Sequence, residues 1–244
     1  GVDAGSSNTD GSITSTVSAN TTAGFSIVSY TGNGTSGATV GHGLGSTLNV
    51  YMAKRRSDTG GSWYMYHSAN TSAPETDFLH LNENYATEDG VQAWNDTAPT
   101  SSVFSLGDNQ NVNANTSTYI AYCFAEKKGY SKFGSYTGNG STDGTYVHLG
   151  FKPAFVLYKQ SSSAGNQWEM RDNLRDVTFN PSDKALAPNL NSAEFTTDPI
   201  DLLSNGFKFR GGNNQDNGSG STYIYMAFAE NPFVTSTGIP TTAR

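Results

Sequence analysis

The chain of 244 residues has few charged residues and no long apolar run. Charged residues make up 14% of it, against about 25% in an average soluble domain. Acidic residues outnumber basic ones and give a net charge of −7, which repels phosphate backbones. The one basic cluster, Lys54-Arg55-Arg56, has only three residues, so we expect no nucleic-acid partner. No apolar run approaches the roughly 20 residues that a membrane span needs, so we expect no membrane partner.

Cysteine is almost absent too, because Cys123 is the only one and an internal disulfide is therefore excluded. Its neighbours Tyr122 and Phe124 are apolar, and we expect a buried small hydrophobe instead of a reactive thiol. Stability must then come from core packing.

Asn, Ser, Thr and Gly take the place of charges, a composition typical of extracellular all-β proteins. The start at Gly1, within a polar stretch, leads us to expect a piece of a longer polypeptide.

The most informative positive feature is an internal repeat. The hexapeptide SYTGNG at 29–34 returns at 135–140, and STYIAYCFAE at 117–126 returns as STYIYMAFAE at 221–230. The offset between the copies falls from 106 residues at the first motif to 104 at the last, as small insertions and deletions would cause. Two copies of one folded unit are therefore predicted. The predicted segments are a polar linker or N-terminal arm over 1–23, repeat 1 over 24–128, repeat 2 over 129–233 and a C-terminal tail over 234–244.

Each repeat is predicted to consist of short strands. Residues 24–30 alternate apolar and polar side chains before Asn33-Gly34, a pair that suits a tight turn. The apolar runs 49–54 and 154–159 are short enough for strands that are buried on both faces. In the final strand of each repeat, small residues share one face, which indicates close approach of another layer. The predicted fold class is all-β, with two tandem antiparallel β-sandwich repeats of a jelly-roll or lectin-like kind.

These motifs together resemble a repeat domain of phage proteins. The segments that carry the resemblance are GFSIVSYTGNG with the following VGHGLG, the strand that ends in Lys54, the strand with Trp63, and YIAYCFAE before GYSKFGSYTGNG. They are similar to the C-terminal repeats of tail-fibre-like virion structural proteins of marine and environmental bacteriophages, over residues 8–244. The resemblance implies β-rich architecture and a place in the virion, on the extracellular particle surface. It implies no catalytic residue and no cofactor.

The candidate ligand-binding residues are aromatic. Trp63 and Trp168 occupy equivalent places in the two repeats, and Tyr64 follows the first. An exposed Trp or Tyr ring can stack on a sugar, but the favoured alternative is that these rings pack in the core. Exposure of Trp63, Tyr64 and Trp168 would favour a lectin-like module, and burial would favour a scaffold.

Several polar residues are candidate metal or ion ligands. His42 and His148 precede Gly-Leu and Leu-Gly in the two copies, without a second ligand at regular spacing, and we expect ordinary histidines of a turn or a strand end. The loops 107–113 and 213–218 are rich in oxygen atoms, as calcium prefers, but each offers one carboxylate. We expect them to cap hairpins through side-chain turns, with a weak ion or sugar site as the alternative. Glu88-Asp89-Gly90 is a similar loop without a counterpart. No metal site is predicted.

A paired-carboxylate glycosidase is the enzymatic alternative. Glu126 and Glu230 both follow the last strand of a repeat, and glycoside hydrolysis needs two carboxyl groups within roughly 5 to 10 Å. Because residues related by the repeat belong to separate units, a glycan depolymerase is the least favoured hypothesis. The prediction is a non-enzymatic virion structural protein of a tail fibre, spike or surface decoration. Its expected partners are other virion proteins, further copies of itself, with a trimer favoured, and a host surface glycan.

Overall fold

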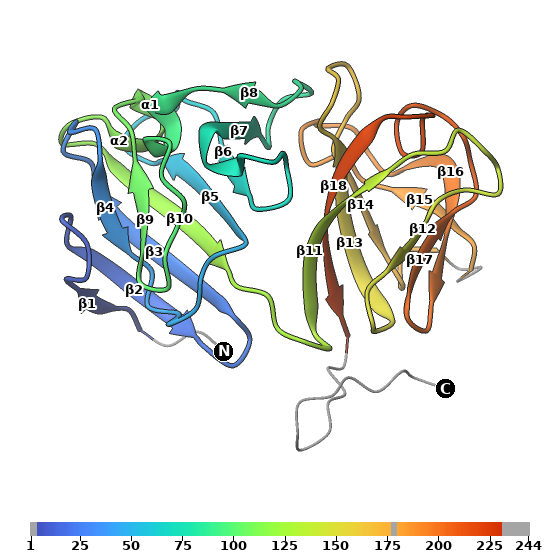
Figure 1. Ribbon diagram of the computed structural model, residues 1–244, viewed down its shortest axis with the longest axis horizontal. Helices are drawn as coiled ribbons and strands as arrows, with labels where there is room; N and C mark the ends of the chain where they lie inside the picture. The colour runs from blue at the N-terminus through green and yellow to red at the C-terminus, as the bar shows by residue number, and fades with distance from the viewer. Residues whose placement is uncertain (1–3, 177–179, 231–244) are drawn as a thin grey trace. The chain divides into compact units, whose positions relative to one another are not determined.

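The computed structural model describes residues 4–176 and 180–230, and it divides into two compact units (Figure 1). Unit 1 holds residues 4–81 and 87–126, and unit 2 holds residues 82–86, 127–176 and 180–230. The division after Glu126 lies close to the predicted boundary between the repeats. The tail predicted over 234–244 lies outside the described residues.

Unit 1 contains two antiparallel sheets around one core. The larger sheet has the strand order β1-β2-β3-β10-β5-β6-β7-β8, and the smaller pairs β4 with β9. The strands are β1 (Ser6–Asn8), β2 (Ser15–Asn20), β3 (Phe25–Thr31), β4 (Ala38–Gly41), β5 (Val50–Arg55), β6 (Tyr64–His67), β7 (Asp77–His80), β8 (Glu88–Asp89), β9 (Val103–Leu106) and β10 (Thr118–Phe124). Three single turns of helix connect them: η1 (Pro74–Thr76), α1 (Val91–Trp94) and α2 (Gln110–Asn113).

Unit 2 is built from two four-stranded antiparallel sheets, ordered β11-β18-β13-β14 and β12-β17-β16-β15. The strands are β11 (Ser131–Thr137), β12 (Tyr146–His148), β13 (Pro153–Gln160), β14 (Glu169–Asp172), β15 (Ser182–Ala185), β16 (Phe195–Leu203), β17 (Gly206–Phe209) and β18 (Thr222–Ala229). The order β11-β18-β13-β14 corresponds to β3-β10-β5-β6 of unit 1, and the pair β12-β17 corresponds to β4-β9. The prediction of an all-β antiparallel sandwich is confirmed, while the duplication itself stays an interpretation of the sequence.

Of the linker or N-terminal arm predicted over 1–23, residues 4–23 are not a linker but part of unit 1. β2 pairs with β3 along its whole length, from Ser15 opposite Tyr30 to Asn20 opposite Phe25, and β1 pairs with β2. Ile13 and Val17 are buried in the core of unit 1. The sequence does not predict β1 and β2, because most of their side chains are Ser, Thr and Asn and apolar residues do not alternate clearly. Such polar side chains suit a sheet that faces water on one side.

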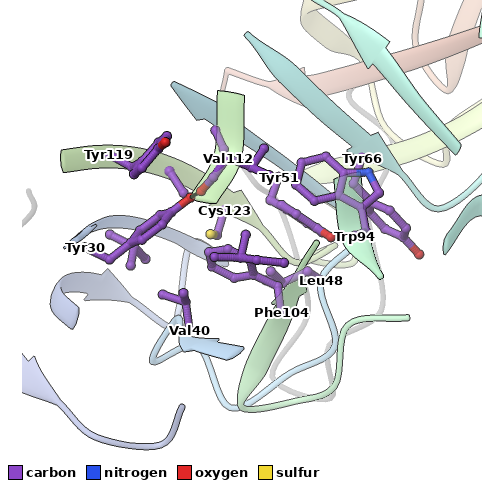
Figure 2. Packing of buried hydrophobic residues seen from close by; sticks show 14 of the residues in the cluster. Tyr30, Val40, Leu48, Tyr51, Tyr66, Trp94, Phe104, Val112, Tyr119 and Cys123 are labelled. Carbon is purple, nitrogen blue, oxygen red and sulfur yellow. Dashed lines mark hydrogen bonds between the residues drawn. The ribbon is translucent and has the colours of Figure 1, made fainter. Parts of the chain in front are cut away.

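The core of unit 1 combines stacked aromatic rings with aliphatic side chains (Figure 2). Tyr51 stacks on Tyr66 with ring centroids 4.9 Å apart and meets the Trp94 ring edge-on at 4.7 Å. The Trp94 ring nitrogen donates to the carbonyl of Asp77 at 3.0 Å. Cys123 is buried on the same face, so the prediction that it is a small core residue is confirmed. Burial also raises the pKa of its thiol far above the usual value.

The repeated SYTGNG motif folds into a turn that is held by one buried asparagine in each unit. In unit 1, Asn113 donates to the carbonyls of Thr35 and Gly107 at 2.9 and 2.8 Å and accepts from the Asn33 amide at 3.0 Å. Asn217 makes the same three bonds in unit 2, with Ser141, Gly211 and Asn139. A Cβ on Gly32 would lie 2.4 Å from the Ala114 carbonyl oxygen, so only glycine fits there. The motif is therefore a structural turn.

Candidate functional site

The predicted aromatic ligand residues do not form one exposed face. Trp168 is 1% exposed and Tyr64 is 5% exposed, so both are core residues that offer no ring to a sugar. Trp63 is half-buried and stacks on Tyr122 with ring centroids 5.9 Å apart. Tyr64 begins β6 and faces the core, and Trp63 precedes it on the opposite side of the chain. The burial of Tyr64 and Trp168 agrees with the favoured alternative that these rings pack in the core, and it leaves Trp63 as a single half-buried ring.

A polar groove of about 630 Å³ lies instead at one end of unit 2. One wall is the loop after β13, and the other is the turn before β18. The groove is lined by Gln160, Ser162, Ser163, Ala164, Gly165, Asn166, Asn214, Ser219, Gly220 and Ser221. None of these side chains is ionisable. The groove therefore presents neutral amide and hydroxyl groups, which both donate and accept hydrogen bonds.

The walls of the groove are fixed to the sheet beneath. Thr222 donates its amide to the Ser162 hydroxyl at 3.0 Å and accepts from the Ser161 amide at 3.0 Å. The Tyr223 hydroxyl donates to the Asn214 carbonyl at 2.8 Å. Because both walls are bonded to the start of β18, the backbone of the groove is held in place before any ligand arrives.

A second polar cluster lies inside unit 2 and is sealed from water. Arg171 is fully buried and forms an ion pair with Glu169 at 3.0 Å, while the Tyr158 hydroxyl donates to the same carboxylate at 2.5 Å. Arg171 also donates to the carbonyls of Asp198 and Ser182 at 2.9 and 3.3 Å. Such a closed network holds charge in a core only while every member stays bonded.

In unit 1 the matching positions are not charged. In unit 2, Glu169 lies opposite Tyr158 and Arg171 lies opposite Val156 across the strand pair β13-β14. At the same places of the strand pair β5-β6 in unit 1, Tyr64 lies opposite Ala53 and Tyr66 lies opposite Tyr51. Glu169 and Arg171 thus take the places of two tyrosines, one of which, Tyr66, is visible in Figure 2.

Asp216 belongs to the same buried cluster and replaces an apolar residue. Its carbonyl accepts from the Tyr136 hydroxyl at 2.7 Å, as the carbonyl of Val112 accepts from Tyr30 at 2.8 Å in unit 1. The Asp216 side chain is fully buried, and neither carboxylate oxygen has a hydrogen-bond partner among the other described residues. Burial, followed by the nearby Glu169 carboxylate, raises the pKa of Asp216 to about 7. The sequence gives no signal of this cluster, because each member lies in an ordinary polar stretch.

The candidate histidines lie at strand ends, as predicted. His42 follows β4, is buried, and has its Nε2 atom 3.3 Å from the Thr100 carbonyl oxygen; burial lowers its pKa. His148 ends β12 and is exposed, with its Nδ1 atom 3.1 Å from the Tyr146 hydroxyl.

The two oxygen-rich loops form the expected side-chain turns, but they do not cap hairpins, because each connects strands of two different sheets, β9 with β10 and β17 with β18. Asn109 accepts from the Asn111 amide at 2.8 Å, and Asn213 accepts from the Gln215 amide at 2.7 Å. Within residues 4–176 and 180–230, no three His, Cys, Asp or Glu side chains are grouped to hold a metal ion.

The carboxylates of the enzymatic alternative, Glu126 and Glu230, are exposed and belong to different units. Glu230 accepts from the Asn173 side-chain amide at 3.1 Å. Glu88 and Asp89, from the third acidic loop, form the exposed edge strand β8.

No helix in the part of the chain that the structure describes is long and apolar enough to cross a membrane.

Comparison with known proteins gives a family and no function. Neither the curated proteins nor the solved structures contain a match to this chain. One family model matches residues 1–232, which is nearly the whole chain and includes both units. The chain therefore belongs to the family described as Domain of unknown function (DUF7483).

Proposed function

We propose that the chain is a non-enzymatic structural module of a phage virion, in a tail fibre, spike or surface decoration that contacts the host. The observation that carries the proposal is the common strand order of the two units, with the same asparagine-held turn in each. Repetition of a scaffold multiplies a surface, as an attachment protein requires. The sequence resemblance to tail-fibre-like repeats supplies the virion context.

The distribution of carboxylates supports a non-enzymatic role. Glu169 and Asp216 are sealed in the core of unit 2, where no substrate reaches them. Glu126 and Glu230 each follow the last strand of their own unit and are exposed to solvent. A catalytic pair needs two carboxyl groups in one groove, and the groove of unit 2 is lined by neutral side chains.

A carbohydrate-binding module is the second candidate, and one observation favours it. The neutral groove of unit 2 is rich in amide and hydroxyl groups, which match the hydroxyl groups of a sugar. The buried rings of Tyr64 and Trp168 speak against the aromatic version of this candidate. The two candidates are compatible, since an attachment protein can bind a host glycan.

Virion appendages are commonly symmetric oligomers, so the first test is the mass of the chain in solution. We expect light scattering to give three times the chain mass of 25.9 kDa, independent of dilution over the micromolar range. A chain that stays monomeric at the highest concentration would contradict assembly through this segment.

A further inference from the structure

We propose that the groove of unit 2 binds a neutral saccharide through the side-chain amides of Asn166 and Asn214, above the buried Gln160 at its base. The inference names a ligand for the attachment role and so rests on the proposed function. It is derived from a difference between the two units at one place in the common strand order.

In unit 1 an arginine fills the equivalent space. Arg55 pairs with Tyr119 across the sheet, as Gln160 pairs with Tyr223 in unit 2. The Arg55 side chain is 14% exposed; its Nε donates to Asp58 at 3.0 Å and its Nη1 to the Gln110 carbonyl at 3.4 Å. It therefore bridges the loop after β5 and the turn before β10. Gln160 is shorter and bonds to Asn166 in its own loop, so the space in unit 2 stays open.

A second residue difference between the two units widens the groove of unit 2. Thr116 has a φ of 64° in unit 1, a conformation that β-branched residues rarely adopt. Gly220 takes its place in unit 2 with a φ of 74°, and a Cβ there would meet nothing within 4 Å. Gly165 in the opposite wall is open in the same way. The N–H groups of the two glycines already donate to the carbonyls of Asn84 and Gly138, so what both walls offer a ligand is open space beside the backbone.

The chemistry of the lining selects the ligand class. Side-chain amides and hydroxyls donate and accept at once, and each sugar hydroxyl does the same. An anion or cation finds no opposite charge among the lining residues, and an apolar molecule finds little apolar wall, since Ala164 is the one apolar side chain. A neutral sugar can form hydrogen bonds with the amide and hydroxyl groups of the groove without desolvating a charge. Because the groove is open, a single site is expected to be weak, and copies in an assembly would add avidity.

The test is a two-dimensional NMR titration of the whole chain that follows side-chain amide resonances. The probes are D-glucose, D-galactose, D-mannose and N-acetyl-D-glucosamine, with N-acetylneuraminic acid as the charged comparator. We expect at least one neutral sugar to shift the amide resonances of Asn166 and Asn214 with millimolar affinity. Gln160→Arg, which copies unit 1, is expected to weaken that binding by at least about tenfold.

Matched variants keep the test decisive. Gly220→Thr copies Thr116 at an exposed position and is expected to block the groove even if Gln160→Arg fails to fold. Ser192→Arg adds the same charge to an exposed loop outside the groove and should leave the shifts unchanged. The proposal is overturned if no neutral sugar shifts these resonances, if the blocking variants bind as well as the parent chain, or if the charged sugar alone binds. Because the titration uses the isolated chain, its failure is separable from failure of the virion role.

Discussion

Replacement of Arg171 by methionine is expected to lower the unfolding free energy of unit 2 by about 3–5 kcal/mol, because it leaves the buried Glu169 carboxylate without its cation. Arg171 and Glu169 are 0% and 1% exposed, and the pair is 3.0 Å apart. The loss should appear in urea unfolding followed by tryptophan fluorescence, since Trp168 is buried just before β14. A pH of 6 keeps Asp216 mainly protonated.

Arg175→Met is the matched control. Arg175 pairs with Asp172 at 2.8 Å and with Glu194 at 3.0 Å, but its side chain is 22% exposed. Partly exposed ion pairs contribute little, so a loss below about 1 kcal/mol is expected. The double variant Glu169→Gln, Arg171→Met should recover much of the stability, since it leaves no unpaired charge in the core. Equal losses for Arg171→Met and Arg175→Met would show that the buried network is not what holds unit 2 together.

Asp216→Val is expected to stabilise unit 2, and the gain should grow with pH. The folded pKa of Asp216, about 7, lies above the ordinary value of 3.8. Between these values the unfolded chain has lost its proton while the folded chain still holds it, so the parent protein loses stability as pH rises through this window. Valine cannot ionise, and Val112 already fills the equivalent place in unit 1. The expected gain is small at pH 4 and reaches about 4 kcal/mol above pH 7.

The measurement is the difference in unfolding free energy between Asp216→Val and the parent chain at a series of pH values from 4 to 8. Asp143→Asn serves as the control, because Asp143 is exposed and its pKa is lowered by a hydrogen bond from Lys208. That variant should show no gain at high pH. A flat difference for Asp216→Val across the series would mean that Asp216 is ionised in the fold at all these pH values, with a partner for its charge.

Much of the fold follows from the sequence because its signals are local. The alternation over 24–30 and the Asn33-Gly34 turn predict β3 and its end at Thr31. Small residues such as Ala121 and Cys123 on one face of β10 predict the close second layer, and both are fully buried. β2 is missed because its membership of the sheet depends on pairing with β3, and its side chains are polar.

The candidate site is harder to predict, because it depends on strand register. Gln160 and Arg55 are unremarkable polar residues until the pairing with Tyr223 and Tyr119 puts them at one place. The same holds for Arg171, whose counterpart is a tyrosine. The groove and the buried charged cluster are thus both found from differences between matched positions of the two units.

The proposed virion role is tested most directly by immunogold electron microscopy of phage particles purified from a lysate in which the chain is made. Antibodies raised against the purified chain are expected to label purified particles at regular places on the tail or capsid surface. Purified particles that lack the chain, while the cell lysate contains it, would contradict a virion role.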